Sequence, residues 1–519
     1  MINKIISFSI KNKFIVGLLT LALIGVGIYS MSTVNLGSVP DITNNQVQVI
    51  TVSQNLGTED IEQFVTYPVE LAMGNLPGVE EIRSISRFGL SVVTIVFEDD
   101  LGTYLPRQLV QEKLNELQET IPQKFGSPSM GPISTGLGQI YEYTIQPKDG
   151  YETKYSPTDL RTIQDWVVKR QLTLLDGVVE VNSYGGYIKQ YEVAVSPDKL
   201  NAQNISISQV FEALARNNVN TGGAYIEKNR MSNFIRGEGL IRSLDDIRKI
   251  VIKTENGIPV TVGDVASNVQ FGHQLRYGSF TQDGKEAVGG IIMMLKGSNP
   301  NAVIQNVKER MEEVEKSLPE GLEISTIIDR SALIARTTDT VKTNLIEGAL
   351  IVIFALVILL GSLRGGIITA TTIPLSLLFA FILMKQFNVW ANLMSLGAID
   401  FGIIIDGAVI IIEGTVYEIQ KRIRAGKTKF NQGVMDELAY DAGSTMMSSA
   451  FFGQVIILIV FAPILFLTGV EGKMFQPMAY TFGFAMIGAI VLCLTYVPMM
   501  SALLMKPVQN KQNCFGRFE

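Results

Sequence analysis

Three carboxylates interrupt an apolar segment in the C-terminal part of the chain. The segment 393–412 contains Asp400 and Asp406, and Glu413 directly follows it. About twenty apolar residues are enough to cross a bilayer. A carboxylate at the bilayer midplane costs at least ~2.5 kcal/mol, and membrane helices that keep one usually use it to carry protons or ions. These residue types therefore predict a helix at the centre of a transporter.

Helical geometry places these three acids on two faces and at different depths of the segment. At about 100° per residue, Asp406 and Glu413 share one face, whereas Asp400 lies roughly 120° away from Asp406. Asp406 falls near the middle of the segment, where an apolar medium disfavours a charged carboxylate and lets it hold a proton near neutral pH. We therefore predict a proton relay of Asp406, Asp400 and Glu413. The alternative is that each acid pairs permanently with a Lys or Arg of another helix.

The composition fits a membrane protein with a large soluble part. Of 519 residues, 47% are hydrophobic and 18% are charged, below the roughly 25% charged of soluble domains. The formal net charge of -6 and the lack of long basic runs give no reason to expect nucleic acid as a partner. The only cysteines, Cys493 and Cys514, predict no disulfide framework. A single histidine, His273, argues against a His-based zinc or copper site.

Hydropathy predicts six membrane spans around one large polar region. The spans are 14–33, 344–362, 367–385, 392–413, 443–468 and 475–505. The first span follows several lysines, as a signal peptide would. Its apolar core is too long for one, however, and no convincing small-residue cleavage site follows, so we expect an uncleaved anchor.

Basic residues predict how the spans are oriented. They cluster on one side of a six-span arrangement, together with the N-terminal lysines: Arg364, Lys421, Arg422, Arg424, Lys427, Lys429, Lys506 and Lys511. Since this side is expected to be cytoplasmic, both chain ends lie there and region 34–343 lies on the opposite side. Lys473, after the fifth span, is a single exception.

The polar region reads as repeated α/β units. Strands at 47–53, 79–86 and 91–99 alternate with helices at 58–74 and 104–121, which gives a βαββα order. A second unit follows, with strands at 140–146, 178–184, 190–196 and 289–295, and helices at 159–175 and 301–318. Residues near 200–280 form an insertion in it. Repeated split βαβ units are consistent with ferredoxin-like subdomains.

Threonines in the third span could add a polar path. Thr371 and Thr372 lie in the sequence TATTIPLSLL, where their hydroxyls could line a route beside the carboxylates. Threonines in membrane helices also commonly bond to their own backbone, which is the alternative reading.

Several segments together resemble one family of transporters. They are LGSVPDI at 36, YPVELAMGNLPGVEEIRSIS at 67, IDRS at 328, MSLGAIDFGIIIDGAVIIIEG at 394 and FLTGVEGKMFQPMAYTFGFA at 466. With the layout of one span, a large α/β region and five clustered spans, the chain resembles the N-terminal half of resistance-nodulation-division efflux pumps, in particular the heavy-metal branch of the cobalt-zinc-cadmium type. The carboxylate helix and the GVEGKMF loop are the most specific parts.

The resemblance implies a secondary transporter and not an enzyme. It implies a proton-driven antiporter of the Gram-negative inner membrane that exports divalent metal cations, with protons as the coupling ion and no bound cofactor. It also implies a homotrimer, surrounded by membrane lipid, that works with a periplasmic adaptor and an outer-membrane channel.

The resemblance also implies a division of the chain. Residues 1–33 would be a cytoplasmic N-terminus and the first span, 34–343 a periplasmic porter and docking region, 344–505 the remaining spans, and 506–519 a cytoplasmic stub. The fold class is then a membrane α-helical bundle of six spans with a large periplasmic α/β region.

By position in the motif, Asp406 matches the family's principal proton-carrying aspartate, and Asp400 and Glu413 match additional acids of the cobalt, zinc and cadmium type. Copper and silver pumps resemble this helix less, since they carry methionines along it, whereas Ile404 and Ile411 flank Asp406 here. Hard or borderline divalent cations are therefore expected.

The chain departs from the family pattern in two respects. Gly414 follows Glu413 where relatives generally carry Asn. A full pump of this family is also about twice as long, with a second half that repeats the first, so we expect a fragment. The missing half would supply the basic partner of Asp406 and most metal ligands.

Candidate metal ligands within this half are few. Glu142 and Asp165 could face a cleft, although surface acids of α/β domains are usually only solvated. Met130, Met293 and Met294 are expected to pack in cores or between domains and not to bind metal.

Functions of other classes are alternatives to heavy-metal transport. An intramembrane aspartyl protease is excluded, because Asp400 and Asp406 lie about 9 Å apart along one helix and on different faces. A non-transporting receptor of the same architecture would not need three acids in this helix. A multidrug efflux pump stays open, because paired acids would serve it equally well.

Overall fold

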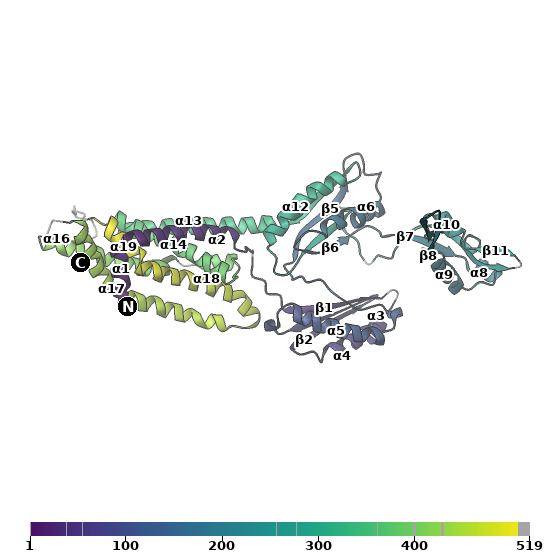
Figure 1. The fold of residues 1–519 in the computed structure, drawn as a ribbon, viewed down its shortest axis with the longest axis horizontal. Coiled ribbons are helices and arrows are strands. Elements are labelled where there is room, and N and C mark those ends of the chain that lie inside the picture. The colour runs from purple at the N-terminus through teal and green to yellow at the C-terminus, as the bar shows by residue number, and fades with distance from the viewer. Residues whose placement is uncertain are drawn as a thin grey trace.

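The computed structural model describes residues 2–37, 39–53, 56–255, 257–276, 278–360, 362–397, 401–426 and 430–506. Figure 1 shows an elongated molecule with a helical bundle at one end, two α/β units beside it and a third α/β part at the far end. The first span leads into the α/β units, and α13 leads back from them into the bundle (Figure 1).

The first α/β unit is a four-stranded antiparallel sheet with helices on one face. Strand β1 alternates buried and partly exposed residues, so that Val47 and Val49 point into the core. The strand order is β2-β3-β1-β4. Its elements are β1 (Asn45–Val52), α3 (Thr58–Ile61), α4 (Tyr67–Met73), β2 (Val79–Arg87), β3 (Leu90–Phe97), α5 (Tyr104–Thr120) and β4 (Ser129–Met130).

The second α/β unit repeats this arrangement. Its sheet has the order β16-β5-β15-β6, so the strands follow one another in space as in the first unit. Asn299 caps α12, its side chain accepting hydrogen bonds from the backbone N–H groups of Asn301 and Ala302 in the first turn. The elements are β5 (Gln139–Pro147), α6 (Pro157–Ile163), α7 (Lys169–Leu172), β6 (Val178–Tyr184), β13 (Thr281–Gln282), β14 (Lys285–Glu286), β15 (Val288–Met294), α12 (Pro300–Ser317) and β16 (Leu322–Asp329).

Both units share an uncommon helical detail. The helix after the first strand of each unit contains one π-helical segment, at Glu62–Thr66 and at Gln164–Val168. Each segment places a buried polar side chain, Thr66 or Gln164, against the sheet, where it bonds to strand residues. The predicted repetition of the α/β region is therefore visible in strand order and in this helix.

The insertion is larger at its N-terminal side than predicted. The strand expected at 190–196 does not belong to the second unit, because β7 pairs with β12 while β6 pairs with β15. Gly185 and Gly186, both with positive φ, separate β6 from β7. The insertion comprises β7 (Lys189–Val195), α8 (Pro197–Ala202), α9 (Ile207–Arg216), β8 (Thr221–Lys228), β9 (Met231–Gly237), α10 (Leu244–Arg248), β10 (Val251–Glu255), β11 (Ile258–Thr261), α11 (Val262–Val265) and β12 (Ala266–His273).

The bundle contains the predicted apolar segments. Among the described residues, five helical stretches are long and apolar enough to span a membrane: 13–33, 363–386, 393–424 without its undescribed residues 398–400, 432–466 and 469–494. The segment predicted at 344–362 lies in α13, whose apolar part is Ile346–Ala355. The elements are α1 (Ile2–Lys11), α2 (Lys13–Thr33), α13 (Arg330–Leu360), α14 (Leu363–Gln386), α15 (Leu393–Gly397), α16 (Phe401–Arg424), α17 (Gln432–Phe461), α18 (Gly469–Leu494) and α19 (Tyr496–Leu504).

Ion pairs mark the two ends of the bundle. Lys13 Nζ lies 2.5 Å from Asp436 Oδ1 at the end where α1 and α19 lie, far from the α/β units (Figure 1). At the other end, Lys473 near the start of α18 pairs with Asp99 of the first α/β unit. Lys473, the exception to the charge pattern, thus lies on the side of the α/β region.

Candidate functional site

The carboxylate helix α16 packs against its neighbours with one side and exposes the other. Its buried residues contact α14, α17 and α18: Ile404, Ile405, Gly407, Ala408, Ile411, Ile412, Gly414, Thr415 and Ile419. Asp406, Glu413 and Tyr417 lie on the exposed side. We call Asp406, Glu413 and Tyr417 the acidic stripe. Asp400 lies outside the described residues.

Two glycines next to the acids form the contact of α16 with α17. A Cβ at Gly407 would lie 2.5 Å from Gln454 Nε2, and one at Gly414 would lie 2.9 Å from Met446 Cγ. Each glycine directly follows an acid, as Asp406-Gly407 and, seven residues later, as Glu413-Gly414. The acids therefore face outward while the glycines allow close approach of α17. This contact also gives Gly414, the departure from the family pattern, a packing role.

The threonines of α14 bond mainly to their own helix. Thr372 donates a hydrogen bond to the Thr369 carbonyl at 2.5 Å, and Thr371 donates one to the Ile368 carbonyl at 2.7 Å. The Thr371 hydroxyl also lies 2.9 Å from the hydroxyl of Tyr496 on α19. Thr371 is therefore linked to another polar group, whereas the Thr372 hydroxyl bonds to backbone.

The candidate ligand Glu142 lies half-buried on β5, where it accepts a hydrogen bond of 3.3 Å from Gln139 Nε2. Nearby, burial raises the pKa of Tyr184 well above its usual range, and the negative charge of Glu142 raises it further. The Tyr184 hydroxyl donates to the Tyr143 carbonyl at 3.0 Å. Tyr184 therefore stays protonated in this environment.

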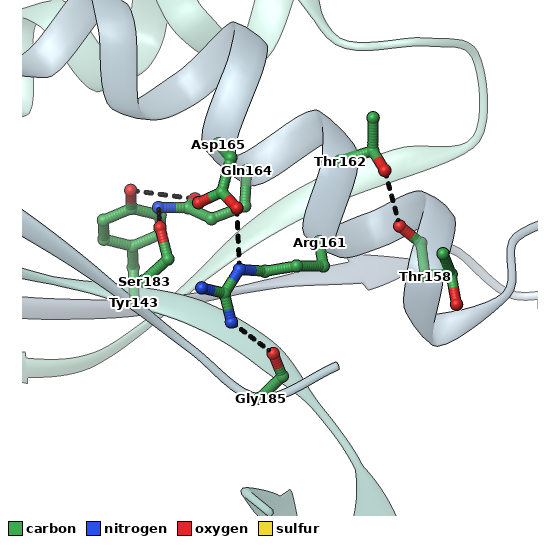
Figure 2. Close-up of polar contacts among 8 residues, drawn as sticks. All are labelled: Tyr143, Thr158, Arg161, Thr162, Gln164, Asp165, Ser183 and Gly185. Carbon is green, nitrogen blue, oxygen red and sulfur yellow. Dashed lines mark hydrogen bonds and ion pairs between the residues drawn. The ribbon is translucent and has the colours of Figure 1, made fainter. Parts of the chain in front are cut away.

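The candidate ligand Asp165 has a basic partner on its own helix. Figure 2 shows Arg161 Nε donating to Asp165 Oδ2 at 2.9 Å, while Arg161 Nη1 donates to the Gly185 carbonyl at 2.9 Å. The guanidinium thereby ties the helix to the end of β6. Among the described residues, no group of three or more His, Cys, Asp and Glu side chains could hold a metal ion.

A buried polar network lies beside this ion pair (Figure 2). The Tyr143 hydroxyl donates to Gln164 Oε1 at 3.0 Å, and Gln164 Nε2 donates to Ser183 Oγ at 3.3 Å. Burial raises the pKa of Tyr143 well above its usual range. Because every polar atom named here has a partner, the network stabilises the second α/β unit.

The methionines considered in the sequence lie in apolar surroundings. Met294 is buried in the core of the second α/β unit, and Met130 packs against the core of the first. The predicted packing role is confirmed for these two methionines, whereas Met293 is partly exposed on β15.

Sequence reasoning missed one polar residue of the bundle, Gln454 on α17. Its side chain is 2% exposed, and among the described residues the only group within hydrogen-bonding reach of its amide is the buried thiol of Cys493. The signal was available in the sequence, because Gln454 interrupts the apolar run AFFGQVIILIVF.

Comparisons with known proteins agree with this architecture. The cation efflux system protein CzcA of Alcaligenes sp. is 43% identical over 518 residues, which are 99% of this chain and 48% of that protein. The cobalt-zinc-cadmium resistance protein CzcA of Cupriavidus metallidurans gives the same figures. A crystal structure of a heavy metal efflux pump matches with a TM-score of 0.84 and 34% identity, over 95% of this chain and 48% of that one.

These matches confirm the resemblance to heavy-metal efflux proteins that the motifs indicated. The chain spans about half the length of the curated relatives it matches. The model of the AcrB/AcrD/AcrF family matches residues 5–519, and the chain therefore belongs to this family.

Proposed function

We propose that this chain is part of a proton-driven antiporter that exports divalent heavy-metal cations. The observation that carries the proposal is the acidic stripe, which places Asp406 and Glu413 on one exposed face of a helix long and apolar enough to span a membrane. Exposed carboxylates are costly in lipid, so other protein segments or a water-filled path would cover the stripe. Asp406 is the main proton carrier in this proposal, with Glu413 and Asp400 as additional acids.

The substrate is a hard or borderline divalent cation such as zinc, cobalt or cadmium. Relatives named for cobalt, zinc and cadmium resistance support this choice. The buried residues of α16 that lie on either side of Asp406, Ile404 and Ile411, offer no thioether ligands. Glu142 and Asp165 are proposed as weak contributors to cation binding, and Thr371 and Thr372 as part of a polar path.

The α/β region is proposed to be periplasmic and built from ferredoxin-like subdomains. The equal strand order of the two sheets supports the ferredoxin-like subdomains. The ion pair of Lys473 with Asp99 supports the periplasmic location, because it neutralises the one basic residue that the charge rule would place on the cytoplasmic side. In this proposal 1–33, 344–505 and 506–519 form the six-span inner-membrane part and its cytoplasmic ends.

The proposed assembly is a homotrimer with a periplasmic adaptor and an outer-membrane channel. The hairpin of β8 and β9 supports an oligomer, because all of its residues are exposed. Five of them are large apolar side chains: Tyr225, Ile226, Met231, Phe234 and Ile235. Apolar side chains exposed on a projecting hairpin are typical of interaction surfaces.

The test is resistance conferred by the complete natural gene in a metal-sensitive bacterial host. Wild-type protein should restore growth in zinc, cobalt or cadmium, and Asp406→Asn should abolish it because an amide cannot carry the proton. Glu418→Gln is the matched control, since Glu418 lies on the same helix and pairs with Lys421 at its basic end. Resistance that survives Asp406→Asn would remove the proton-carrier role, and resistance to organic compounds alone would favour a multidrug pump.

A further inference from the structure

Among the described residues of the bundle, buried polar atoms without a conventional hydrogen-bond partner occur on Gln454 and at Nε of Arg422, whose Nη1 pairs with Glu437. A buried amide normally has hydrogen-bond partners, because leaving one without them destabilises the fold. Gln454 is 2% exposed, and among the described residues the only group within hydrogen-bonding reach of its amide is the buried thiol of Cys493. In contrast, the buried hydroxyls of Ser376, Thr415 and Ser501 each donate to a carbonyl of their own helix.

The amide of Gln454 lies against the carboxylate helix. The position of a Cβ at Gly407 would be 2.5 Å from Nε2 and 3.0 Å from Oε1 of Gln454. Glycine is therefore required at position 407 for this approach, and position 407 directly follows Asp406. The amide also bonds to the buried thiol of Cys493 on α18, which is only a weak hydrogen-bonding group.

We propose that Gln454 is a positioning residue for Asp406, which it influences through the contact with Gly407. The inference rests on the proposed proton-coupled function. In the arrangement described here the amide has only the weak thiol partner, so a hydrogen bond to an α16 backbone carbonyl would stabilise a shifted position of α16. Gln454 therefore stabilises a second position of α16, and the protonation of Asp406 selects between the two positions.

The other titratable groups near α16 lie on several helices. In the apolar stretches of the helices packed against it, they are Glu347 on α13, Tyr480 and Cys493 on α18, and Tyr496 on α19. The stretch 442–461 of α17 and the stretch 365–384 of α14 contain no titratable residue. On α16 itself, Glu413 and Tyr417 lie on the acidic stripe with Asp406, and Asp400 of the proposed relay directly precedes the helix in sequence. The N-terminal part of α17 adds Asp436, Glu437, Tyr440 and Asp441, and Glu437 pairs with Arg422 of α16.

The experiment uses the complete natural protein in proteoliposomes and measures zinc-driven proton flux between pH 5.5 and 8.5. Gln454→Met removes the amide at nearly constant volume. We expect an apparent unfolding temperature equal to or above that of wild type, since a buried polar group with only a weak partner is removed. Proton flux should fall at least threefold, with a pH profile shifted by about 0.5–1 unit. Gln454→Asn, which keeps an amide, should retain more flux than Gln454→Met.

Ser501→Ala is the matched control, because it removes a buried hydroxyl that bonds only to its own helix. It should leave the pH profile unchanged. The inference is overturned if Gln454→Met keeps the wild-type pH profile, whether or not it unfolds at a lower temperature. Flux that persists in Asp406→Asn would instead show that the proposed function itself has failed.

Discussion

Lys473 of the membrane bundle and Asp99 of the first α/β unit form an ion pair in which Nζ lies 2.7 Å from Oδ1. Lys473 also donates a hydrogen bond of 3.1 Å to the Thr43 carbonyl at the base of the same unit. Lys296, from the loop after β15, lies in this cluster, where burial lowers its pKa and the negative charge of Asp41 opposes the shift. The start of α18 is therefore joined electrostatically to the α/β region.

The loss of stability caused by reversing the charge of Lys473 should be compensated by also reversing the charge of Asp99. Lys473→Glu places like charges together and should lower stability by about 0.5–1 kcal/mol, since Asp99 is half exposed to solvent. Lys473→Glu combined with Asp99→Lys should recover most of the loss. The measurement is the apparent unfolding temperature in low and high salt, where high salt should shrink the difference. No recovery in the double variant would mean that the pair does not couple the two parts.

The buried network of the second α/β unit should be sensitive to loss of one hydroxyl. Tyr143→Phe leaves Gln164 Oε1 without its donor, which should destabilise the protein by about 1–3 kcal/mol. Tyr155→Phe is the control, because its hydroxyl bonds to the Glu320 carbonyl at the protein surface and its loss should have little effect. Thermal unfolding compares the two variants, and equal effects would argue against a special role for the network.

Stability should depend on pH through Asp329, which lies in the IDRS motif. Burial acts to raise the pKa of Asp329, but hydrogen bonds from Lys308 and Ser331 outweigh it and hold the pKa below its ordinary value. A lowered folded pKa means that the stabilisation is complete above the unfolded pKa of about 3.9 and is lost as the pH falls through the folded pKa.

Asp329→Asn should therefore lower stability by about 1 kcal/mol at neutral pH, because Lys308 is partly exposed and screened. The difference from wild type should shrink only below about pH 4. Unfolding temperatures of both proteins from pH 3 to pH 8 measure it. A difference that disappears already near pH 6 would contradict this assignment.

Glycine should be required at position 414, because the side chain of Met446 leaves no room there for a Cβ atom. Gly414→Asn introduces the residue expected from the family pattern, but its Cβ would lie 2.9 Å from Met446 Cγ. We expect a loss of about 1–3 kcal/mol from overpacking. Met446→Ala should restore most of it by making room. The unfolding temperature of the single and double variants decides, and a wild-type value for Gly414→Asn alone would show that the contact opens without strain.

Local spacing was enough to predict part of the candidate site. Asp406 and Glu413 share one face because they are seven residues apart on a helix, and helical periodicity alone determines that. Both side chains are exposed in the structure. The partner of Asp165 was also predictable, since Arg161 lies one helical turn before it at i,i+4 spacing. Asp400 lies outside the described residues, and its role stays a prediction.

Long-range contacts could not be predicted in the same way. The packing of Gln454 against Gly407 depends on which two helices meet, and hydropathy does not determine that. Strand β7 was assigned to the wrong sheet because its apolar alternation suits any half-buried strand, and its true partner β12 is far away in sequence.

The way in which the insertion is attached has an evolutionary consequence. The chain enters it through β7 and leaves it through β12, and the register pairs Lys189 with His273, so that the two crossing points are adjacent. A segment whose two ends meet can be replaced by one of another length without changing the strand order of its host sheet. Genes of this family could therefore exchange residues 189–273 as one cassette and acquire a new outer surface in a single recombination event.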